Sequence, residues 1–390
     1  MNYTHTIWKL YVYRFFYNLI PAYVIERLFW EERGMTIQQV IYTEIIFAIT
    51  VVLLEVPTGI IADKWGRKKM IVSGAFLECS MFLILLFARE FWHFAVAIFL
   101  AGIARSASSG SENALLYDAL QQGGQEQAFE KYYGRLNVVD LTAIILAALS
   151  GSLLANQYSF ELNYWISVIS MLVSVCASLL LVEHTVKSKT EESIQFKEYV
   201  RFSFDFFRNN QNVLLVVLSG IVIGSALNFL DEFWQLYLNR LEIPVIYFGL
   251  FSAVIMMVRL PGNLIAHILK NQFRYRSILL GVTAVCAVGF FYVSVIRDYS
   301  SLAVILLICL VSGIMEPITA GYLHHRIDSS MRATIDSFQS LGINAAIIIS
   351  GLGFGYFSSK FDIFGGFWFV ACICIGFLVY FLFASKRITQ

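Results

Sequence analysis

Long stretches without a charged side chain are the feature that most limits how this chain can fold. Ser277–Ile296 and Ile363–Ala384 are the clearest examples. A helix needs about 20 apolar residues to cross the hydrocarbon core of a bilayer, and both stretches reach that length. Charged residues make up 14% of the chain, against about 25% in soluble domains. The sequence therefore predicts an all-α integral membrane protein.

Twelve transmembrane helices are predicted from the apolar segments that lie between charged residues, glycines and prolines. They cover residues 8–29, 40–61, 70–88, 92–116, 134–155, 163–182, 212–238, 246–268, 276–296, 301–323, 333–357 and 362–384. The longest polar interruption separates six spans from six. We therefore expect an N-terminal six-helix bundle over 1–183, a cytoplasmic linker over 184–211 and a C-terminal six-helix bundle over 212–390. The linker sequence suits either a helix lying in the membrane interface or a plain connection.

The placement of lysine and arginine predicts the orientation of the chain, because these residues accumulate in cytoplasmic loops. With the N-terminus inside, 20 of them, Arg14 included, fall at the inner ends of spans and 6 at the outer ends. The remaining two, Arg105 and Arg259, fall within spans. This distribution predicts a multi-pass protein of the cell membrane with both termini in the cytoplasm.

A charged loop between the second and third spans carries the pattern G-x-x-x-D-[RK]-x-G-[RK]-[RK]. Its residues are Gly59, Asp63, Lys64, Gly66, Arg67 and Lys68. Gly66 permits a tight turn, and the basic residues hold the loop on the cytoplasmic side. The pattern resembles the signature loop of the major facilitator superfamily, in particular its bacterial drug-efflux members. The twelve-span, two-half organisation resembles the fold of that family over essentially the whole chain.

Gating is the role that this resemblance implies for the loop. The aspartate that matches Asp63 docks on the N-terminus of the eleventh helix when such a transporter opens outward. In this chain that helix begins in the segment "SSMRATID", residues 329–336, where free amides and the helix dipole attract an anion. A purely topological anchor is the alternative role.

The two halves of the sequence match each other weakly at an offset of 204 residues. Glu55–Asp63 aligns with Arg259–His267, which places Pro57 on Pro261, and Glu112 aligns with Glu316. Internal repeats with a substrate site between them are typical of secondary transporters. The repeat therefore favours a duplicated six-helix unit.

Charged residues within spans are candidates for function because a charge at membrane depth is costly. Arg105 and Glu112 lie seven residues apart in the fourth span and so share a helix face. The family resemblance implies that the first, fourth, seventh and tenth helices line a central cavity, which makes both residues candidates for binding substrate or protons.

Three further acids are candidates in the second half. Glu316 precedes Pro317, which removes a backbone donor and predicts a kink beside an acid in the tenth span. Asp231 and Glu232 lie near the outer end of the seventh span, where a solvated helix terminus is the alternative explanation. Glu44, Glu55 and Arg259 are predicted to form structural charge pairs, with a role in the cytoplasmic gate as the equal alternative for Glu55.

Several kinds of site are not predicted. No nucleotide-binding loop or G-x-S-x-G motif is present, no cysteine pair has zinc-ligand spacing, and the net charge is +1. We therefore expect no enzyme activity, cofactor, metal or nucleic acid. The expected partners are a small-molecule substrate, protons and the lipid bilayer, and the expected oligomeric state is a monomer.

A secondary active transporter that exports small amphipathic or cationic compounds in exchange for protons is the leading functional hypothesis. Acids within the spans suggest the proton coupling, since a carboxylate in an apolar site can exchange a proton near neutral pH. A symporter or facilitator for a nutrient or an anionic metabolite is one alternative. A membrane receptor that has lost transport is another.

Overall fold

The computed structural model describes residues 3–183, 206–208, 210–324 and 332–385. These residues contain helices and connecting segments and no strand. They form two compact units, one within Met1–Thr190 and Ile243–Ala253, the other within Glu191–Glu242 and Val254–Gln390. The predicted linker lies almost wholly outside the described residues, so its bounds and its interfacial helix stay predictions.

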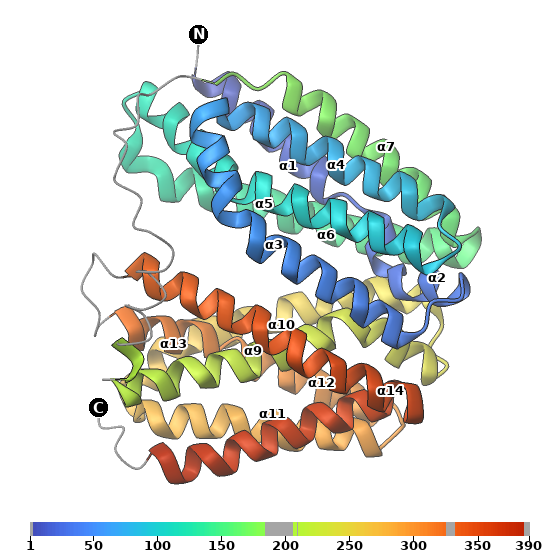
Figure 1. Cartoon of the computed structure of the whole chain (residues 1–390), viewed down its shortest axis with the longest axis vertical. Coiled ribbons are helices and arrows are strands. Elements are labelled where there is room, and N and C mark those ends of the chain that lie inside the picture. Colours follow the sequence, from blue (N-terminus) through green and yellow to red (C-terminus); the bar gives the residue numbers. More distant parts are fainter. Residues whose placement is uncertain (1–2, 184–205, 209, 325–331, 386–390) are drawn as a thin grey trace. The chain divides into compact units, whose positions relative to one another are not determined.

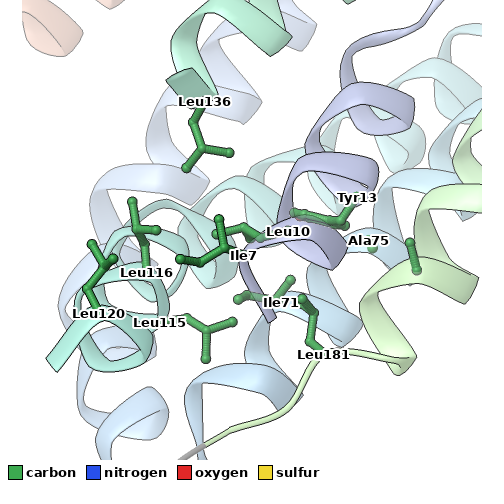
Figure 2. Packing of buried hydrophobic residues seen from close by; sticks show 11 residues of the cluster. Ile7, Leu10, Tyr13, Ile71, Ala75, Leu115, Leu116, Leu120, Leu136 and Leu181 are labelled. Atoms are coloured by element: carbon green, nitrogen blue, oxygen red, sulfur yellow. The ribbon is translucent and has the colours of Figure 1, made fainter. Parts of the chain in front are cut away.

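The first unit consists mainly of long helices. They are α1 (Tyr3–Asn18), η1 (Pro21–Val24), α2 (Glu26–Glu32), α3 (Ile37–Trp65), α4 (Arg67–Phe87), α5 (Phe91–Gln122), η2 (Glu126–Ala128), α6 (Phe129–Gln157) and α7 (Phe160–Leu179). In Figure 1, α4 lies beside α5 and α7, and it packs against both, while α1 packs against α6 and α7. Apolar side chains from α1, α4, α5, α6 and α7 meet in one buried cluster (Figure 2).

The second unit contains α9, most of α10 and the helices that follow. They are α9 (Gln211–Arg240), α10 (Phe248–Gln272), α11 (Tyr275–Val295), α12 (Ser300–Ser312), α13 (Met315–His324) and α14 (Arg332–Ala384), whereas the short 3-10 helix η3 (Val245–Tyr247) belongs to the first unit. The last helix packs against α9 and α11 (Figure 1). It contains two consecutive spans, because the backbone leaves helical geometry at Phe361 and Asp362.

The predicted fold of twelve transmembrane helices is confirmed. Ten described segments are long and apolar enough to cross a membrane, and the longest, Gln339–Ala384, contains both spans of α14. Counting those two spans separately and adding the broken first span gives the twelve predicted helices.

The first span is not one continuous helix, so the prediction of a single helix over 8–29 is wrong. The chain forms α1, the short 3-10 helix η1 and α2 instead. Pro21 has no N–H to donate to the carbonyl one turn earlier, which ends the α-helix. Gly151 of α6 stabilises this break by close packing, since a Cβ there would lie 2.4 Å from the Pro21 carbonyl oxygen.

The tenth span is also broken, which agrees with the kink predicted beside Glu316. The break lies at Gly313 and Ile314, between α12 and α13. Pro317 is the third residue of α13, where the backbone N–H would have no partner within the helix. The proline therefore fits the first turn of α13, and it cannot donate to the Gly313 carbonyl at the break one turn earlier.

Candidate functional site

The signature loop is a tight turn between α3 and α4. Gly66 ends α3 and precedes α4 with a φ of 109°, which only glycine adopts readily. A Cβ at this position would lie 2.6 Å from Oε2 of Glu183, just beyond α7. The side chain of Asp63 and those of residues 332–338 lie outside the described part of the chain, so the docking of Asp63 stays a prediction.

Two carboxylates hold the first residues of α4. The backbone N–H of Arg67 donates to Oε1 of Glu183 at 2.5 Å, and that of Lys68 donates to Oε2 at 3.4 Å. The Arg67 guanidinium donates to the Ala114 carbonyl at 3.1 Å and forms an ion pair with Asp118 of α5. An anion at a helix N-terminus satisfies free amides. The loop is therefore tied to α5 and to the end of α7.

Replacing Gly66 by alanine is expected to destabilise the protein. The left-handed backbone strain costs about 1–2 kcal/mol, and the added methyl group would also displace Glu183 from the start of α4. Thermal unfolding of purified protein in detergent measures the effect. Gly59→Ala is the matched control, because a Cβ at Gly59 meets no described atom within 4 Å. Equal unfolding temperatures for the two variants would contradict this account of the turn.

An ion cluster joins three helices of the first unit. Arg14 of α1 contacts both Glu112 of α5 and Asp140 of α6. Its Nε donates to Asp140 Oδ1 at 3.0 Å, and a second guanidinium nitrogen donates to Oδ2. The Tyr13 hydroxyl donates to Glu112 Oε1 at 2.8 Å, and the Asn18 amide donates to Asp140 Oδ1 at 2.9 Å. Every carboxylate oxygen in the cluster therefore accepts a hydrogen bond.

The apolar cluster beside these ions positions them. Tyr13 is fully buried and belongs to the apolar cluster that Figure 2 shows, which also contains Ile7, Leu10 and Ala75. Glu112 is only 6% exposed. The side chains of Glu112 and Asp140 are 8% and 13% exposed and that of Arg14 is 27% exposed, so the two carboxylates depend mainly on their hydrogen-bond partners for solvation.

Arg105 and Glu112, which the sequence placed on one face of the fourth span, lie in different surroundings. Glu112 is buried and paired with Arg14, whereas Arg105 is exposed and forms no ion pair among the described residues. Arg105 lies within electrostatic range of Tyr17 and Glu78. Sequence reasoning missed Arg14 as a partner because it counted this residue among the cytoplasmic charges. The apolar stretch "YVYRFFYN" around it was the available signal.

The predicted charge pairs involve different partners. Glu44 pairs with Arg27 of α2 at 2.6 Å, and the Arg27 guanidinium lies over the ring of Trp30. Glu55 is exposed, and no ion pair of its side chain is found within the described part of the chain. Arg259 pairs with Asp231, so a residue expected to be structural and a residue expected to be functional form one ion pair.

A cavity of about 400 Å³ lies inside the second unit. It is lined by Gly220, Ile223, Gly224, Leu227, Asn228, Asp231, Arg259, Asn263, Ser312, Gly313, Met315, Glu316, Thr319, Gln339 and Ile343. These residues come from α9, α10, α12, α13 and α14 together with the break before α13. Three of the charged residues singled out from the sequence therefore meet at one site: Asp231, Arg259 and Glu316.

The charges in this cavity do not balance. Arg259 Nη2 lies 2.5 Å from Asp231 Oδ1 and 3.8 Å from the Cys309 sulfur, so one carboxylate neutralises the guanidinium. Glu316 is exposed to the cavity and has no ion pair among the described residues. Asp231 is nine residues from the end of α9, not at a solvated terminus. Glu232 does not line the cavity. Two acids against one base leave a net negative charge.

Two glycines let α10 and α12 cross at close range beside this cavity. A Cβ at Gly262 would lie 2.2 Å from the Leu310 carbonyl oxygen, and a Cβ at Gly313 would lie 2.3 Å from the Arg259 carbonyl oxygen. Small residues permit such contact between membrane helices. The crossing places the backbone of Arg259 against the break in the tenth span.

Substituting Gly262 by valine is expected to push α10 away from α12, since backbone atoms cannot move as a flexible side chain can. Overpacking of this kind costs about 1–3 kcal/mol, and thermal unfolding in detergent measures the loss. Gly281→Val on α11 serves as the control, because no described atom lies within 4 Å of a Cβ there. Unchanged stability of the Gly262 variant would show that the two helices do not cross so closely.

Comparison with known proteins gives a family match over most of the chain. The model described as Major Facilitator Superfamily matches residues 11–335. An uncharacterized MFS-type transporter of Bacillus subtilis, YxaM, is 23% identical over 337 residues, which cover 82% of this chain and 80% of that protein. A Na⁺, Li⁺, K⁺/H⁺ antiporter of Planococcus maritimus is 27% identical over 201 residues, 47% of this chain and 45% of its own length.

Two further similarities concern drug resistance and fold. The chloramphenicol resistance protein CraA of Acinetobacter baumannii is 25% identical over 227 residues, 57% of this chain and 53% of that protein. The crystal structure of the nucleoside transporter NupG superposes with a TM-score of 0.81 over 99% of this chain and 100% of that one, at 13% identity. The structural likeness establishes the fold alone.

Proposed function

The chain belongs to the major facilitator superfamily, and from this premise we propose that it exports small cationic or amphipathic compounds in exchange for protons. Family membership makes it a multi-pass membrane transport protein for small molecules and not an enzyme. The coupling ion, the direction and the substrate class are the proposed part. We further propose that it works as a monomer with both termini in the cytoplasm.

The observation that carries this proposal is the uneven charge of the cavity in the second unit. Its volume of about 400 Å³ lies within the range of small-molecule sites. Asp231 neutralises Arg259, which leaves the carboxylate of Glu316 available to a cation. Leu227 and Ile343 offer apolar contact beside the acid. A site with these groups suits an amphipathic cation better than an anion.

Exchange follows from competition at Glu316. The carboxylate binds either a proton or a cation, because a proton removes the charge that attracts the cation. Loading the site from one side with a proton and from the other with substrate couples the two movements. Among the relatives, the name of the Na⁺, Li⁺, K⁺/H⁺ antiporter agrees with this exchange, and the name of the chloramphenicol resistance protein agrees with export of a small compound.

Uptake of an anionic metabolite is the weaker alternative. In this cavity it would need a free base, and Arg259, the base among the lining residues, is engaged by Asp231 at 2.5 Å. An anion would have to displace that carboxylate and would also meet Glu316. The receptor alternative gives no reason for a cavity with an unpaired acid.

Purified protein in liposomes under an imposed pH gradient tests the proposal. A lipophilic quaternary cation, Na⁺, K⁺, chloramphenicol and an anionic sugar phosphate are added in turn, and a pH-sensitive dye reports proton movement. We expect a cation or chloramphenicol to accelerate proton flux relative to protein-free liposomes. Acceleration by the sugar phosphate alone would support the anion alternative, and no acceleration by any compound would refute proton exchange.

A further inference from the structure

We propose that the break in the tenth span forms a binding site for a monovalent metal cation such as Na⁺. Its oxygen ligands are the Gly313 carbonyl, the Glu316 carboxylate and the hydroxyls of Ser312 and Thr319. These residues all line the cavity of the second unit. The ion is a transported substrate and not a resident cofactor. That role rests on the proposed function, whereas binding of the ion does not.

One backbone carbonyl at the break has no hydrogen-bond donor. In a continuous α-helix the N–H of residue 317 would donate to the carbonyl of residue 313. Pro317 has no N–H, and no other group in the described part of the chain donates to the Gly313 carbonyl. The next N–H group, that of Ile318, donates to the Ile314 carbonyl at 3.3 Å. An unpaired carbonyl at membrane depth is costly, and a bound cation satisfies it.

Two hydroxyl groups present oxygen lone pairs to the same cavity. Ser312 Oγ donates to the Cys309 carbonyl at 2.8 Å, and Thr319 Oγ1 donates to the Met315 carbonyl at 2.8 Å. Both residues are buried apart from the surface that they give the cavity. Because the helix backbone engages each hydroxyl proton, each oxygen can act only as an acceptor towards a ligand. These hydroxyls therefore suit a cation rather than an anion.

The spacing of the ligands places them on one side of the broken span. Ser312, Glu316 and Thr319 are separated by four and three residues, which brings side chains to one helix face. The C-terminal end of α12, at Ser312, carries a partial negative charge. The positive end of α13 lies at the same break, and Glu316 in its first turn bears the full opposite charge. Carbonyls freed at such helix breaks coordinate Na⁺ in membrane transporters.

The charge of the cavity favours a monovalent ion. Asp231 neutralises Arg259, so the carboxylate of Glu316 is balanced by one positive charge. A divalent ion would leave an excess positive charge at membrane depth, which is costly. The described lining residues include neither histidine nor cysteine. Oxygen ligands alone favour a hard cation over zinc or copper.

Thermal unfolding of the purified protein in detergent tests binding without any transport. Choline chloride is replaced by NaCl, KCl or LiCl at constant pH and ionic strength. A ligand that binds only the folded protein raises the unfolding temperature. We expect a rise with Na⁺ that saturates. Stabilisation by methylammonium or Ca²⁺ and by none of the three alkali ions would overturn the proposal.

Pro317→Ala examines the carbonyl ligand, because alanine supplies the missing N–H to the Gly313 oxygen. Without Na⁺ the variant should be at least as stable as the wild type. Its half-maximal Na⁺ concentration should rise by about tenfold. Pro261→Ala is the matched control, since it adds an N–H within α10 away from the described lining residues. A wild-type Na⁺ response in the Pro317 variant would contradict coordination by Gly313.

Thr319→Val examines a hydroxyl ligand with almost no change in side-chain size. Thr283→Val is its control, because Thr283 is a buried threonine of α11 that donates to the Leu279 carbonyl at 2.7 Å and does not line the cavity. Both variants lose the same kind of backbone bond, but the Thr319 variant alone should respond more weakly to Na⁺. Glu316→Gln should abolish the response. Equal Na⁺ responses in the two threonine variants would overturn this ligand set.

The unfolding measurement separates this proposal from proton exchange. Saturable stabilisation by Na⁺ in a protein that moves no protons in liposomes would refute proton exchange and leave the ion site standing. Proton flux driven by organic cations, without stabilisation by any alkali ion, would refute the ion site and leave proton exchange standing.

Discussion

Glu316→Gln is expected to abolish proton-driven transport while leaving the protein folded. The variant keeps the size of the side chain but removes the unpaired charge that lines the cavity of the second unit. An interaction with a charged group contributes about 1.5–3 kcal/mol, so its loss should lower transport by more than about tenfold. The measurement is substrate-dependent proton flux in liposomes, with reconstituted protein quantified in each sample.

The control for this prediction is Glu126→Gln, which neutralises an exposed acid in η2 of the first unit. It changes the net charge by the same amount and should transport at the wild-type rate. Thermal unfolding of both variants excludes a folding defect. Wild-type flux through the Glu316 variant would remove Glu316 from the mechanism, and equal loss in both variants would point to a general effect of charge.

Arg14→Gln is expected to destabilise the protein severely. Two carboxylates that now share a guanidinium would face each other without a base. Removing one partner of a buried ion pair costs about 3–5 kcal/mol. A large drop in the unfolding temperature in detergent, or a low yield of monodisperse protein, is the expected observation.

Two comparisons give this second prediction its specificity. Arg33→Gln removes a base whose partner, Glu161, is 42% exposed, and exposed pairs contribute at most about 1 kcal/mol. Adding Asp140→Asn to Arg14→Gln removes one of the two carboxylates that have lost their base. The double variant should therefore recover part of the lost stability. Equal losses for Arg14→Gln and Arg33→Gln, or no recovery in the double variant, would contradict the role given to the cluster.

Much of the fold could be predicted because helices that cross a bilayer must be apolar over their whole length. That local requirement identified the spans in the sequence. It could not identify the break at Pro21, since a broken helix is as apolar as a continuous one, whereas Pro317 did indicate the break in the tenth span at Gly313. Both breaks depend on partners distant in the sequence: Gly151 packs against Pro21, and the α10 backbone packs against Gly313.

The candidate sites were less predictable than the fold. The sequence singled out four residues because placing a charged side chain within an apolar span costs free energy, and such residues are therefore rare. They are Glu112, Asp231, Arg259 and Glu316. Their partners were not predictable in the same way. Arg14 lies 98 residues from Glu112 and 126 from Asp140, and no local pattern links positions so far apart.

The sequence by itself determined the membrane class, the approximate spans and the signature loop, because each follows from properties of neighbouring residues. Only the tertiary structure decided which charges neutralise one another. It pairs Arg259 with Asp231 and leaves Glu316 open to the cavity, and it sets Arg14 between Glu112 and Asp140. The energy of a buried charge depends on the groups within a few ångströms of it, and helix packing alone brings those groups together.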